Sequence, residues 1–470
     1  MPHASRAAVC AGFAVLLAAF PSASLPEPCP ISSPTPAQAP LADHVVLISI
    51  DGMLPAHYLD SAWPAPTLQL LAREGAHAMG VRSVFPSVTY PAHTTIVTGA
   101  LPIRHGIYYN SPFEPGGQTG RWYWDEVDIE VPTLWDAVLA AGRTSASLSW
   151  PVTVGAPIEW NIPEVWSLEE GVDFLEVMKP SSTPADLFDE IEREATGRLT
   201  TENFNNFSLI RDDRIGAIAA YLLETKQPAL LAVHILGVDH FQHEAGLEAE
   251  IVKRALTCAD NAVRQIVDAA ESAGILERTA FLVFGDHGFV PIHTVLAPNV
   301  WLTEAGLMQA RDDRGDWRAT IHTTAASAFL HLRDPEDHEA AAQARQVLEN
   351  QPRNIRKLYR IVDRDGLEEI GAAPEAAFAL ALMPGVSVTA SPYGPAVRPG
   401  AGATHGFWPT LPELQAGFIA WGSGIRETAV VPTMGLEDIA PLVAELLGLK
   451  FQAPDGMAPV GLLSEPNSKQ

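Results

Sequence analysis

Four short segments of this chain place metal-binding side chains beside apolar runs, which restricts the folds that can bring them together. The segments are ISIDG, LGVDHFQH, VFGDHG and ATHG, and their candidate ligands are Asp51, Asp239, His243, Asp286, His287 and His405. Three carboxylates and three imidazoles suffice for two sites with three ligands each. Oxygen and nitrogen ligands without thiolates suit zinc or another divalent first-row metal. We therefore expect two divalent metal ions, most simply two Zn²⁺.

The apolar runs themselves indicate an α/β fold. Residues 45–50, 81–85, 144–150, 229–236, 279–285 and 413–422 are expected to be strands, and residues 67–75, 133–142, 252–273 and 436–449 helices. Several of the strand segments are continuously apolar, which is typical of central strands covered on both faces. Asp51, Asp239 and Asp286 follow such segments, and open α/β sheets bind ligands beyond the carboxyl ends of their strands.

The order of these patterns also predicts the domain organisation. Residues 1–24 are expected to be a secretory signal peptide, because Arg6 precedes an apolar run over 7–20 that small residues follow. An uncleaved N-terminal anchor is the alternative, although the run is too short to span a membrane. A Pro-rich linker over 25–42 then leads to a catalytic core formed by 43–296 and 399–463, with 297–398 as an inserted cap. The protein is thus expected to be exported, to the periplasm or the exterior.

The charge of the chain limits its partners. Thirty basic residues against 56 acidic ones give a formal net charge of −26, which opposes binding to nucleic acid polymers and anionic lipid surfaces. It also opposes an anionic substrate unless a local positive centre overrides it, and two divalent cations among three carboxylates would supply that centre. The expected partner is a small-molecule phosphate ester. The sequence does not indicate the oligomeric state or whether Cys29 and Cys258 pair.

Each ligand motif has a simpler interpretation when it is taken alone. Asp239 and His243 are four residues apart, so a helix would put them on one face, where they could equally form a surface ion pair. Asp286 and His287 are adjacent, which requires a turn after the strand and could be ordinary loop polarity. It is their occurrence together with Asp51 and His405 that favours a metal centre.

A fifth segment, FPSVTYPAH, places a hydroxyl where a helix should begin. Thr89 is a good N-cap residue, and Pro91 is tolerated in the first helical turn. The simple interpretation is that Thr89 caps the helix. A hydroxyl at the positive end of a helix dipole is also well placed to meet a phosphate group and to act as a nucleophile. Both roles are compatible.

These five segments resemble the type I phosphodiesterase/nucleotide pyrophosphatase family of the alkaline phosphatase superfamily over nearly all of residues 43–450. The resemblance implies an alkaline-phosphatase-like three-layer sandwich with a central, mostly parallel sheet. It also implies that Thr89 bridges both metals and attacks phosphorus to give a phosphothreonine intermediate, and that Asn110 donates a hydrogen bond to a phosphate oxygen. Locally, Asn110 is equally well explained as a turn residue. The implied ligands of one zinc are Asp239, His243 and His405, and those of the other are Asp51, Asp286 and His287.

The sequence departs from the family pattern beside the nucleophile. Members that act on nucleotides often have Phe and then Asn where this chain has Tyr90 and Ala92. Tyr90 could stack on a base or an aryl leaving group, or only pack at the rim of the pocket. Ala92 removes a polar group, which weakens the transfer of nucleotide specificity.

We expect a two-metal hydrolase of phosphodiesters or pyrophosphates, and other functions remain open. A phosphate monoesterase would need Lys or Arg to reach the extra charge of its substrate, and only Arg82 and Arg104 lie near the motif in sequence. A phosphonate hydrolase shares the metal core. A catalytically silent binding protein that keeps the fold is the alternative outside enzymes. The leaving group cannot be inferred from the sequence.

Overall fold

The computed structural model describes residues 39–205 and 208–464, and its main element is a large mixed sheet. The strand order is β17 (Val430–Val431), β2 (Ala76–Arg82), β16 (Ala416–Gly422), β6 (Thr279–Phe284), β1 (His44–Ile50), β5 (Leu230–Ile235), β3 (Ser145–Leu148) and β4 (Trp160–Ile162), and β18 (Met434–Gly435) also pairs with β2. Only β16 runs antiparallel to its neighbours β2 and β6. The prediction of a mostly parallel central sheet is therefore confirmed.

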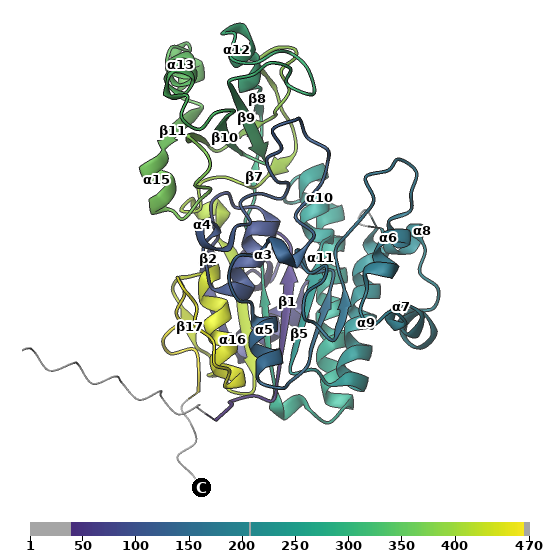
Figure 1. Cartoon of the computed structure of the whole chain (residues 1–470). Helices are drawn as coiled ribbons and strands as arrows, with labels where there is room; N and C mark the ends of the chain where they lie inside the picture. Colours follow the sequence, from purple (N-terminus) through teal and green to yellow (C-terminus); the bar gives the residue numbers. More distant parts are fainter. Residues whose placement is uncertain (1–38, 206–207, 465–470) are drawn as a thin grey trace, which may run out of the picture. The chain divides into compact units, whose positions relative to one another are not determined.

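Helices cover both faces of this sheet, as Figure 1 shows. Alternate residues of β1 enter two different cores: Val46 and Ile48 pack on one face, and Val45 and Leu47 on the other. The first face is covered by α2 (Pro66–Glu74), α9 (Leu209–Lys226) and α11 (Glu250–Ser272), and the second by α3 (Thr89–Thr98), α5 (Leu134–Ala140) and α16 (Ile439–Leu447). This double burial explains why the strand sequences are continuously apolar rather than alternating. The expected three layers are present.

Further helices connect and extend these layers. They are α1 (Ala56–Leu59), α4 (Pro102–His105), α6 (Phe174–Ser181), α7 (Leu187–Ile191), α8 (Thr201–Phe204), α10 (Gly237–Ala245), α12 (Pro298–Glu304), α13 (His338–Glu349), α14 (Arg353–Arg356) and α15 (Arg364–Glu369).

Three small sheets lie in the segment between β6 and β16. One pairs β7 (Val290–Pro291) with β15 (Ala403–Thr404), and a second has the order β13 (Val386–Val388), β8 (Thr294–Leu296), β14 (Val397–Pro399). The third has the order β11 (Tyr359–Asp363), β12 (Phe378–Leu382), β10 (Ser327–Leu332), β9 (Ala319–Thr324). These sheets begin before residue 297 and end after residue 398. The limits of an inserted cap stay a prediction.

The strand expected at 81–85 differs from the structure, since β2 starts at Ala76, directly after the end of α2. Gly75 makes the abrupt change possible: a Cβ atom on it would lie 2.2 Å from the carbonyl oxygen of Ala420 on β16. Only a residue without a side chain lets the backbone pass this close to the neighbouring strand. The apolar pattern alone did not show that the helix and the strand are contiguous.

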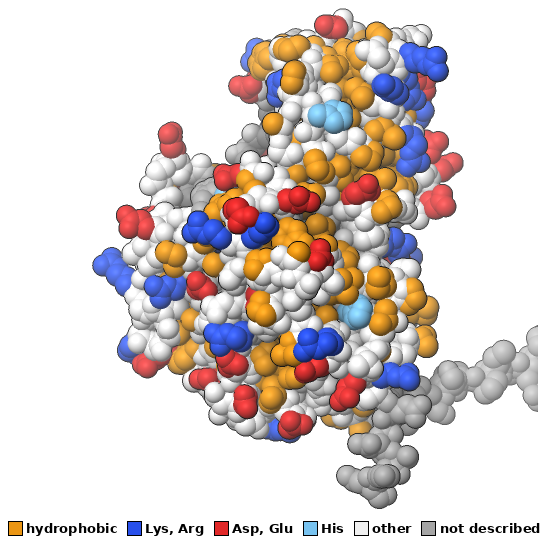
Figure 2. Space-filling model, turned by 180° about the vertical axis from the view of Figure 1, so that it is seen from behind, with side chains coloured by type: hydrophobic (Ala, Val, Ile, Leu, Met, Phe, Trp, Pro, Cys, Tyr) orange, Lys and Arg blue, Asp and Glu red, His pale blue; other side chains and the backbone are white. Residues whose placement is uncertain are grey.

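The surface and the termini bear on the remaining predictions. Figure 2 shows acidic and basic side chains interspersed on one face of the molecule. No helix in the described ranges is both long and apolar enough to cross a membrane. The predicted signal peptide, and the linker as far as residue 38, lie outside the described residues.

Candidate metal centre

The six predicted ligands come from the carboxyl-end edge of the central sheet and from the return of the chain after the small sheets. Asp51 follows β1, Asp239 and His243 lie on α10 just after β5, and Asp286 and His287 follow β6. Strands β5, β1 and β6 are parallel neighbours, so their carboxyl ends meet at one edge. His405 comes from the residue after β15.

The structure brings these side chains into two groups that share one histidine. Asp51, Asp286 and His287 form one group, and the other is Asp239, His287 and His405; within each group the potential ligand atoms lie within 4.8 Å of one another. The Nε2 atom of His287 lies 3.3 Å from Oδ1 of Asp51 and 3.2 Å from Oδ2 of Asp286.

His243 stands beside the second group, to which the family resemblance assigned it as a ligand. The Nε2 atom of His243 is 3.5 Å from Oδ1 of Asp239, and its ring centroid lies 5.0 Å from that of His405. Its helix α10 puts Asp239 and His243 on one face, as their spacing predicted. His243 is therefore close enough to serve as a further ligand of the same cation.

The polar atoms of this centre are better arranged to bind divalent cations than to form hydrogen bonds with one another. Among the described residues, Oδ1 of Asp51, Oδ1 of Asp239, Oδ2 of Asp286 and both ring nitrogens of His287 are buried without a hydrogen-bond partner. Buried polar groups are rarely left unpaired. Three carboxylates and several imidazoles arranged in this way are the donor set that zinc and similar ions take.

The pKa shifts of the same groups have the same origin. Burial raises the pKa of Asp51 well above its usual value, and the nearby Asp239 adds to the rise. Burial, followed by the charge of Asp51, raises the pKa of Asp286 as well. Burial lowers the pKa of His405 to about 4 and lowers that of His287 well below its usual range. Neutral imidazoles are the form that binds metal, and bound cations would displace protons from the carboxyl groups.

Backbone carbonyl groups orient two of the imidazoles. Nδ1 of His243 lies 3.0 Å from the oxygen of Ala403, and Nδ1 of His405 lies 2.8 Å from that of Ser87. Because a carbonyl oxygen only accepts, each Nδ1 is the protonated nitrogen, and each Nε2 keeps its lone pair. Both Nε2 atoms face Asp239, at 3.5 Å and 3.7 Å from its Oδ1. This is the usual way in which proteins fix a histidine as a metal ligand.

Thr89 lies next to this centre, but it is not the N-cap that the sequence predicted. The N-cap of α3 is Val88, which has no capping side chain, and Thr89 is the first helical residue. The Thr89 hydroxyl lies close to the Asp51 carboxyl group, whose pKa burial raises well above its usual value and the neighbouring Thr89 lowers in part. The nucleophile candidate is therefore free of a capping role and is directed toward a candidate metal ligand.

Asn110 takes over the capping role from outside the helix. Its Oδ1 atom accepts a hydrogen bond of 3.0 Å from the backbone N–H of Tyr90, the second residue of α3. This bond fixes the amide orientation, so the Nδ2 group is the donor that remains. Asn110 also lines a cavity next to the centre.

Tyr90 does not fit the stacking role considered for it. Its side chain is fully buried, its ring lies edge-on to Trp122 at 5.1 Å, and its hydroxyl has no hydrogen-bond partner among the described residues. Trp122 lines the cavity in its place. Tyr90 is therefore buried behind Trp122 rather than exposed to the cavity.

The cavity beside the centre has a volume of about 310 Å³. His243 and His405 line the cavity on the side of the candidate metal centre. Asn110, Trp122 and His322 are among the other residues that line it. None of the described residues that line it is Lys or Arg. The two arginines considered from sequence are engaged elsewhere: Arg104 donates to Asp455 at 2.9 Å, and Arg82 pairs with Glu437.

The sequence analysis missed His234, which lies within β5 and holds the Asp51 carboxyl group. Its Nε2 atom is 3.1 Å from Oδ2 of Asp51, and its Nδ1 atom is 3.1 Å from the oxygen of Ser149. Glu164 lies 3.5 Å from the same Nδ1. The ring of His93 lies 4.3 Å from that of His234. A histidine within an apolar strand was the only available signal.

Comparison with known proteins agrees with this geometry. The sequence matches the type I phosphodiesterase/nucleotide pyrophosphatase family over residues 45–407. The chain belongs to this family.

Individual relatives are distant. The chain is 26% identical over 276 residues to an uncharacterized pyrophosphatase/phosphodiesterase of Schizosaccharomyces pombe, which covers 58% of this chain and 50% of the relative. It is 28% identical over 260 residues to the human bis(5'-adenosyl)-triphosphatase, with 51% and 55% covered. Human ectonucleotide pyrophosphatase/phosphodiesterase family member 1 is 23% identical over 286 residues, with 57% and 25% covered. The chain thus spans about half or less of these relatives.

Solved structures of the family share the fold. Human ectonucleotide pyrophosphatase/phosphodiesterase 5 superposes with a TM-score of 0.60 at 17% identity, covering 87% of this chain and 96% of that one. An inactive threonine-to-alanine variant of the murine protein, in complex with AMP, gives 0.63 at 16% identity, with 90% and 100% covered. The alkaline-phosphatase-like fold expected for this family member is confirmed.

Proposed function

We propose that this family member is a metal-dependent hydrolase of phosphodiesters or pyrophosphates that acts through a phosphothreonine on Thr89. One observation carries the proposal: buried, unpaired ligand atoms of Asp51, Asp239, Asp286 and His287 converge beside the hydroxyl of Thr89. A cluster of this kind is costly to fold unless it binds cations. A structural role for the cluster would not require the adjacent nucleophile.

The residues of the chain supply nucleophile, orientation and hydrogen-bond donors. Thr89 stands at the N-terminus of α3, where the helix dipole favours a negatively charged phosphoryl group. Its hydroxyl lies close to the Asp51 carboxyl group, so an acceptor stands beside the proton of the nucleophile. Nδ2 of Asn110 donates to a non-bridging phosphate oxygen, since Oδ1 is held by the N–H of Tyr90. Displacement by Thr89 and then by water gives net retention at phosphorus.

Two divalent ions, most simply Zn²⁺, would be held by Asp51, Asp286 and His287 and by Asp239, His243 and His405. When bound, such ions lower the pKa of a coordinated hydroxyl and stabilise the attacking and leaving oxygens of an in-line displacement. His287 lies in both groups of the structure, so it would be within reach of either ion.

The lining of the cavity favours a diester or pyrophosphate over a monoester. A monoester brings an additional negative charge that Lys or Arg usually meets, and the described lining of the cavity contains neither. A murine relative is described in complex with AMP, which makes a nucleotide ester a reasonable substrate. Trp122 offers an aromatic surface to such a ligand.

Export is part of the same proposal. Two of the relatives named above are ectonucleotide enzymes by name, and the N-terminal pattern predicts a signal peptide over 1–24. N-terminal sequencing of mature protein should begin near Leu25. A mature protein that still begins at Met1 would contradict this.

The test compares two threonines of the same helix. Thr89→Ala should lower kcat/KM for bis(4-nitrophenyl) phosphate at least about a thousandfold, since the attacking atom is lost, and should abolish covalent phosphate on the protein in mass spectrometry. Thr94→Ala is the matched control, because Thr94 is buried one turn later and donates only to the oxygen of Tyr90. Full activity of Thr89→Ala would overturn the assignment. So would activity that survives exhaustive chelation.

A further inference from the structure

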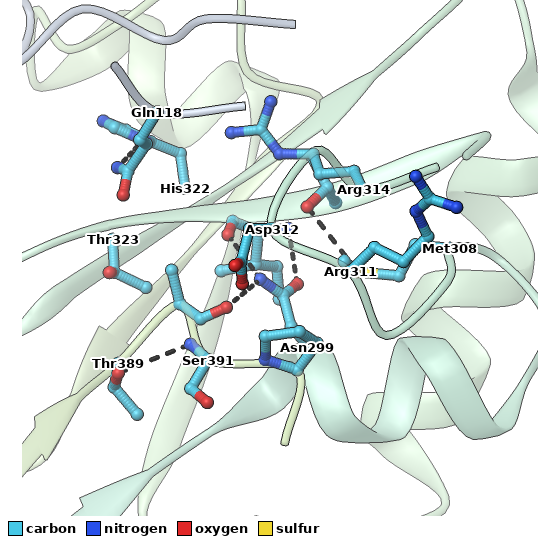
Figure 3. Close-up of a pocket in the computed structure, with 14 residues that line it drawn as sticks. Gln118, Asn299, Met308, Arg311, Asp312, Arg314, His322, Thr323, Thr389 and Ser391 are labelled. Carbon is cyan, nitrogen blue, oxygen red and sulfur yellow. Dashed lines mark hydrogen bonds between the residues drawn. The ribbon is translucent and has the colours of Figure 1, made fainter. Parts of the chain in front are cut away.

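A second cavity adjoins the one beside the metal centre. It has a volume of about 420 Å³ and shares Gln118, His322 and Thr323 with the first cavity. Figure 3 shows the residues that surround it, with Asn299, Thr389 and Ser391 opposite the loop that carries Arg311 and Arg314. A substrate bound at the metal centre can therefore extend past His322 into this space.

Arg314 is a buried cation at this cavity. Its residue is only 7% exposed, and its guanidinium group donates to the carbonyl oxygen of Glu114 and stacks over the rings of Phe113 at 4.9 Å and Trp317 at 5.9 Å. No carboxylate of the described residues lies within salt-bridge distance of it. Burial lowers the pKa of Arg314 and the nearby charge of Glu114 raises it in part, while the Glu114 carboxylate itself is hydrogen-bonded to Thr119.

Two observations relate Arg314 to the path between the cavities. Burial lowers the pKa of His322 to about 4, and the positive charge of Arg314 adds to this effect, so the two groups are close. In Figure 3 the guanidinium group of Arg314 lies on the side of the cavity where Gln118 and His322 stand. Arg314 also has a positive φ of 58°, a backbone conformation that a non-glycine residue adopts at a cost.

The other charges of the lining do not neutralise Arg314. Arg311 is fully paired with Asp313 through two hydrogen bonds of 2.8 Å each. Asp312 is the only acidic residue among those that line the cavity, and it is exposed. A buried guanidinium group without a carboxylate at salt-bridge distance is less favourable than one that an anion meets.

We propose that this second cavity binds an anionic group of the substrate, such as a further phosphate, against Arg314. The inference rests on the proposed function and narrows it to substrates with a negative charge beyond the phosphoryl group that is attacked. A pyrophosphate bond to a nucleotide meets this condition, whereas an aryl ester of the same nucleotide does not.

The test compares two substrates that share the AMP moiety: ATP, whose leaving group carries further phosphates, and the 4-nitrophenyl ester of AMP, whose leaving group carries none. Arg314→Gln should lower the ratio of kcat/KM for ATP to that for the ester about tenfold or more, because a charge-assisted hydrogen bond is lost. Asp312→Asn should raise the ratio, since it removes the acidic side chain that repels the anion. Arg318→Gln is the control, because Arg318 lies in the same segment outside the cavity and is paired with Asp337.

The outcomes separate this inference from the proposed function. If the wild-type enzyme hydrolyses neither substrate, the proposed function is wrong and the anion subsite with it. If it hydrolyses both and neither Arg314→Gln nor Asp312→Asn changes the ratio, only the subsite is overturned. Because Arg314 also fixes the loop at Glu114, the melting temperature of each variant is measured. If Arg314→Gln does not fold, the Asp312→Asn variant decides: a raised ratio of kcat/KM for ATP to that for the ester supports the subsite, and an unchanged or lowered ratio overturns it.

Discussion

Replacing His234 by Leu tests whether the metal centre depends on a histidine that binds no metal. Both ring nitrogens of His234 face oxygen acceptors, Oδ2 of Asp51 and the carbonyl oxygen of Ser149, each at 3.1 Å. Leu fills a similar volume and removes both hydrogen bonds. Oδ2 of Asp51 is then released, and Oδ1 is no longer held toward the cation site.

The expected loss of metal affinity follows from these contacts. Removing a group that orients a metal ligand typically costs about 10- to 100-fold in affinity, which corresponds to about 1.4–2.8 kcal/mol. A hydrogen bond to a charged group is worth about 1.5–3 kcal/mol, so one released carboxylate accounts for the whole effect. We expect weaker binding of only one of the two ions, the one that Asp51, Asp286 and His287 would hold.

The assay is a competition titration of zinc between the protein and a chromophoric chelator, read as two binding steps. His44→Leu is the matched control, because His44 also lies in a buried strand and makes one hydrogen bond, of 2.8 Å, to the carbonyl oxygen of Pro228. It begins β1 and therefore lies at the strand end opposite Asp51. Both variants should lose some stability toward urea, and only His234→Leu should weaken zinc binding. Equal zinc affinities in the two variants would refute the reasoning.

Three further changes test the packing, the electrostatics and the metal requirement. Burial raises the pKa of Asp212 from 3.8 to about 6. Between these two values the folded protein keeps a proton on Asp212 that the unfolded chain has released. The free energy of unfolding should therefore fall by about 3 kcal/mol at most as the pH rises from 4 to 6, and it should not change further above pH 6. Urea titrations should show that Asp212→Asn removes this fall, and an unchanged slope would contradict the assignment. Gly285→Ala should lower the melting temperature strongly, since a Cβ would lie 2.4 Å from the oxygen of Met53, whereas Gly116→Ala, with nothing within 4 Å, should leave it unchanged; equal melting temperatures would show that the backbone relaxes. Chelation should remove hydrolysis of bis(4-nitrophenyl) phosphate and added Zn²⁺ should restore it, because the freed carboxylates are buried close together.

Much of the central sheet could be predicted because burial on both faces leaves an unambiguous pattern in the sequence. Residues 45–50, 229–236 and 279–285 are continuously apolar and correspond to β1, β5 and β6. The side chains that follow them were recognised as candidate ligands because polar groups at strand ends meet at one edge of a sheet. The structure brings them together there. Their role as metal ligands stays a prediction until metal is measured.

Other features depend on contacts between distant segments and leave no local signal. The exchange of capping roles is one: Asn110 caps α3 from another part of the chain, so Thr89 was read as the cap. His234 occupies a strand position that looks like ordinary core, and only its approach to Asp51 shows its role. The cavity at Arg314 forms only where segments distant in the sequence come together, and no periodic pattern of residues in the sequence predicts this.

The position of His405 has a consequence for how the protein matures. His405 follows β15, after all three small sheets have been made, whereas Asp51 ends the first strand of the main sheet. During synthesis, a growing chain therefore lacks a complete set of metal-binding groups until it extends past His405. Ions acquired earlier would meet only a partial cluster. A complete metal centre thus becomes available only after the strands of the three small sheets have been made, while β16 and α16 still follow.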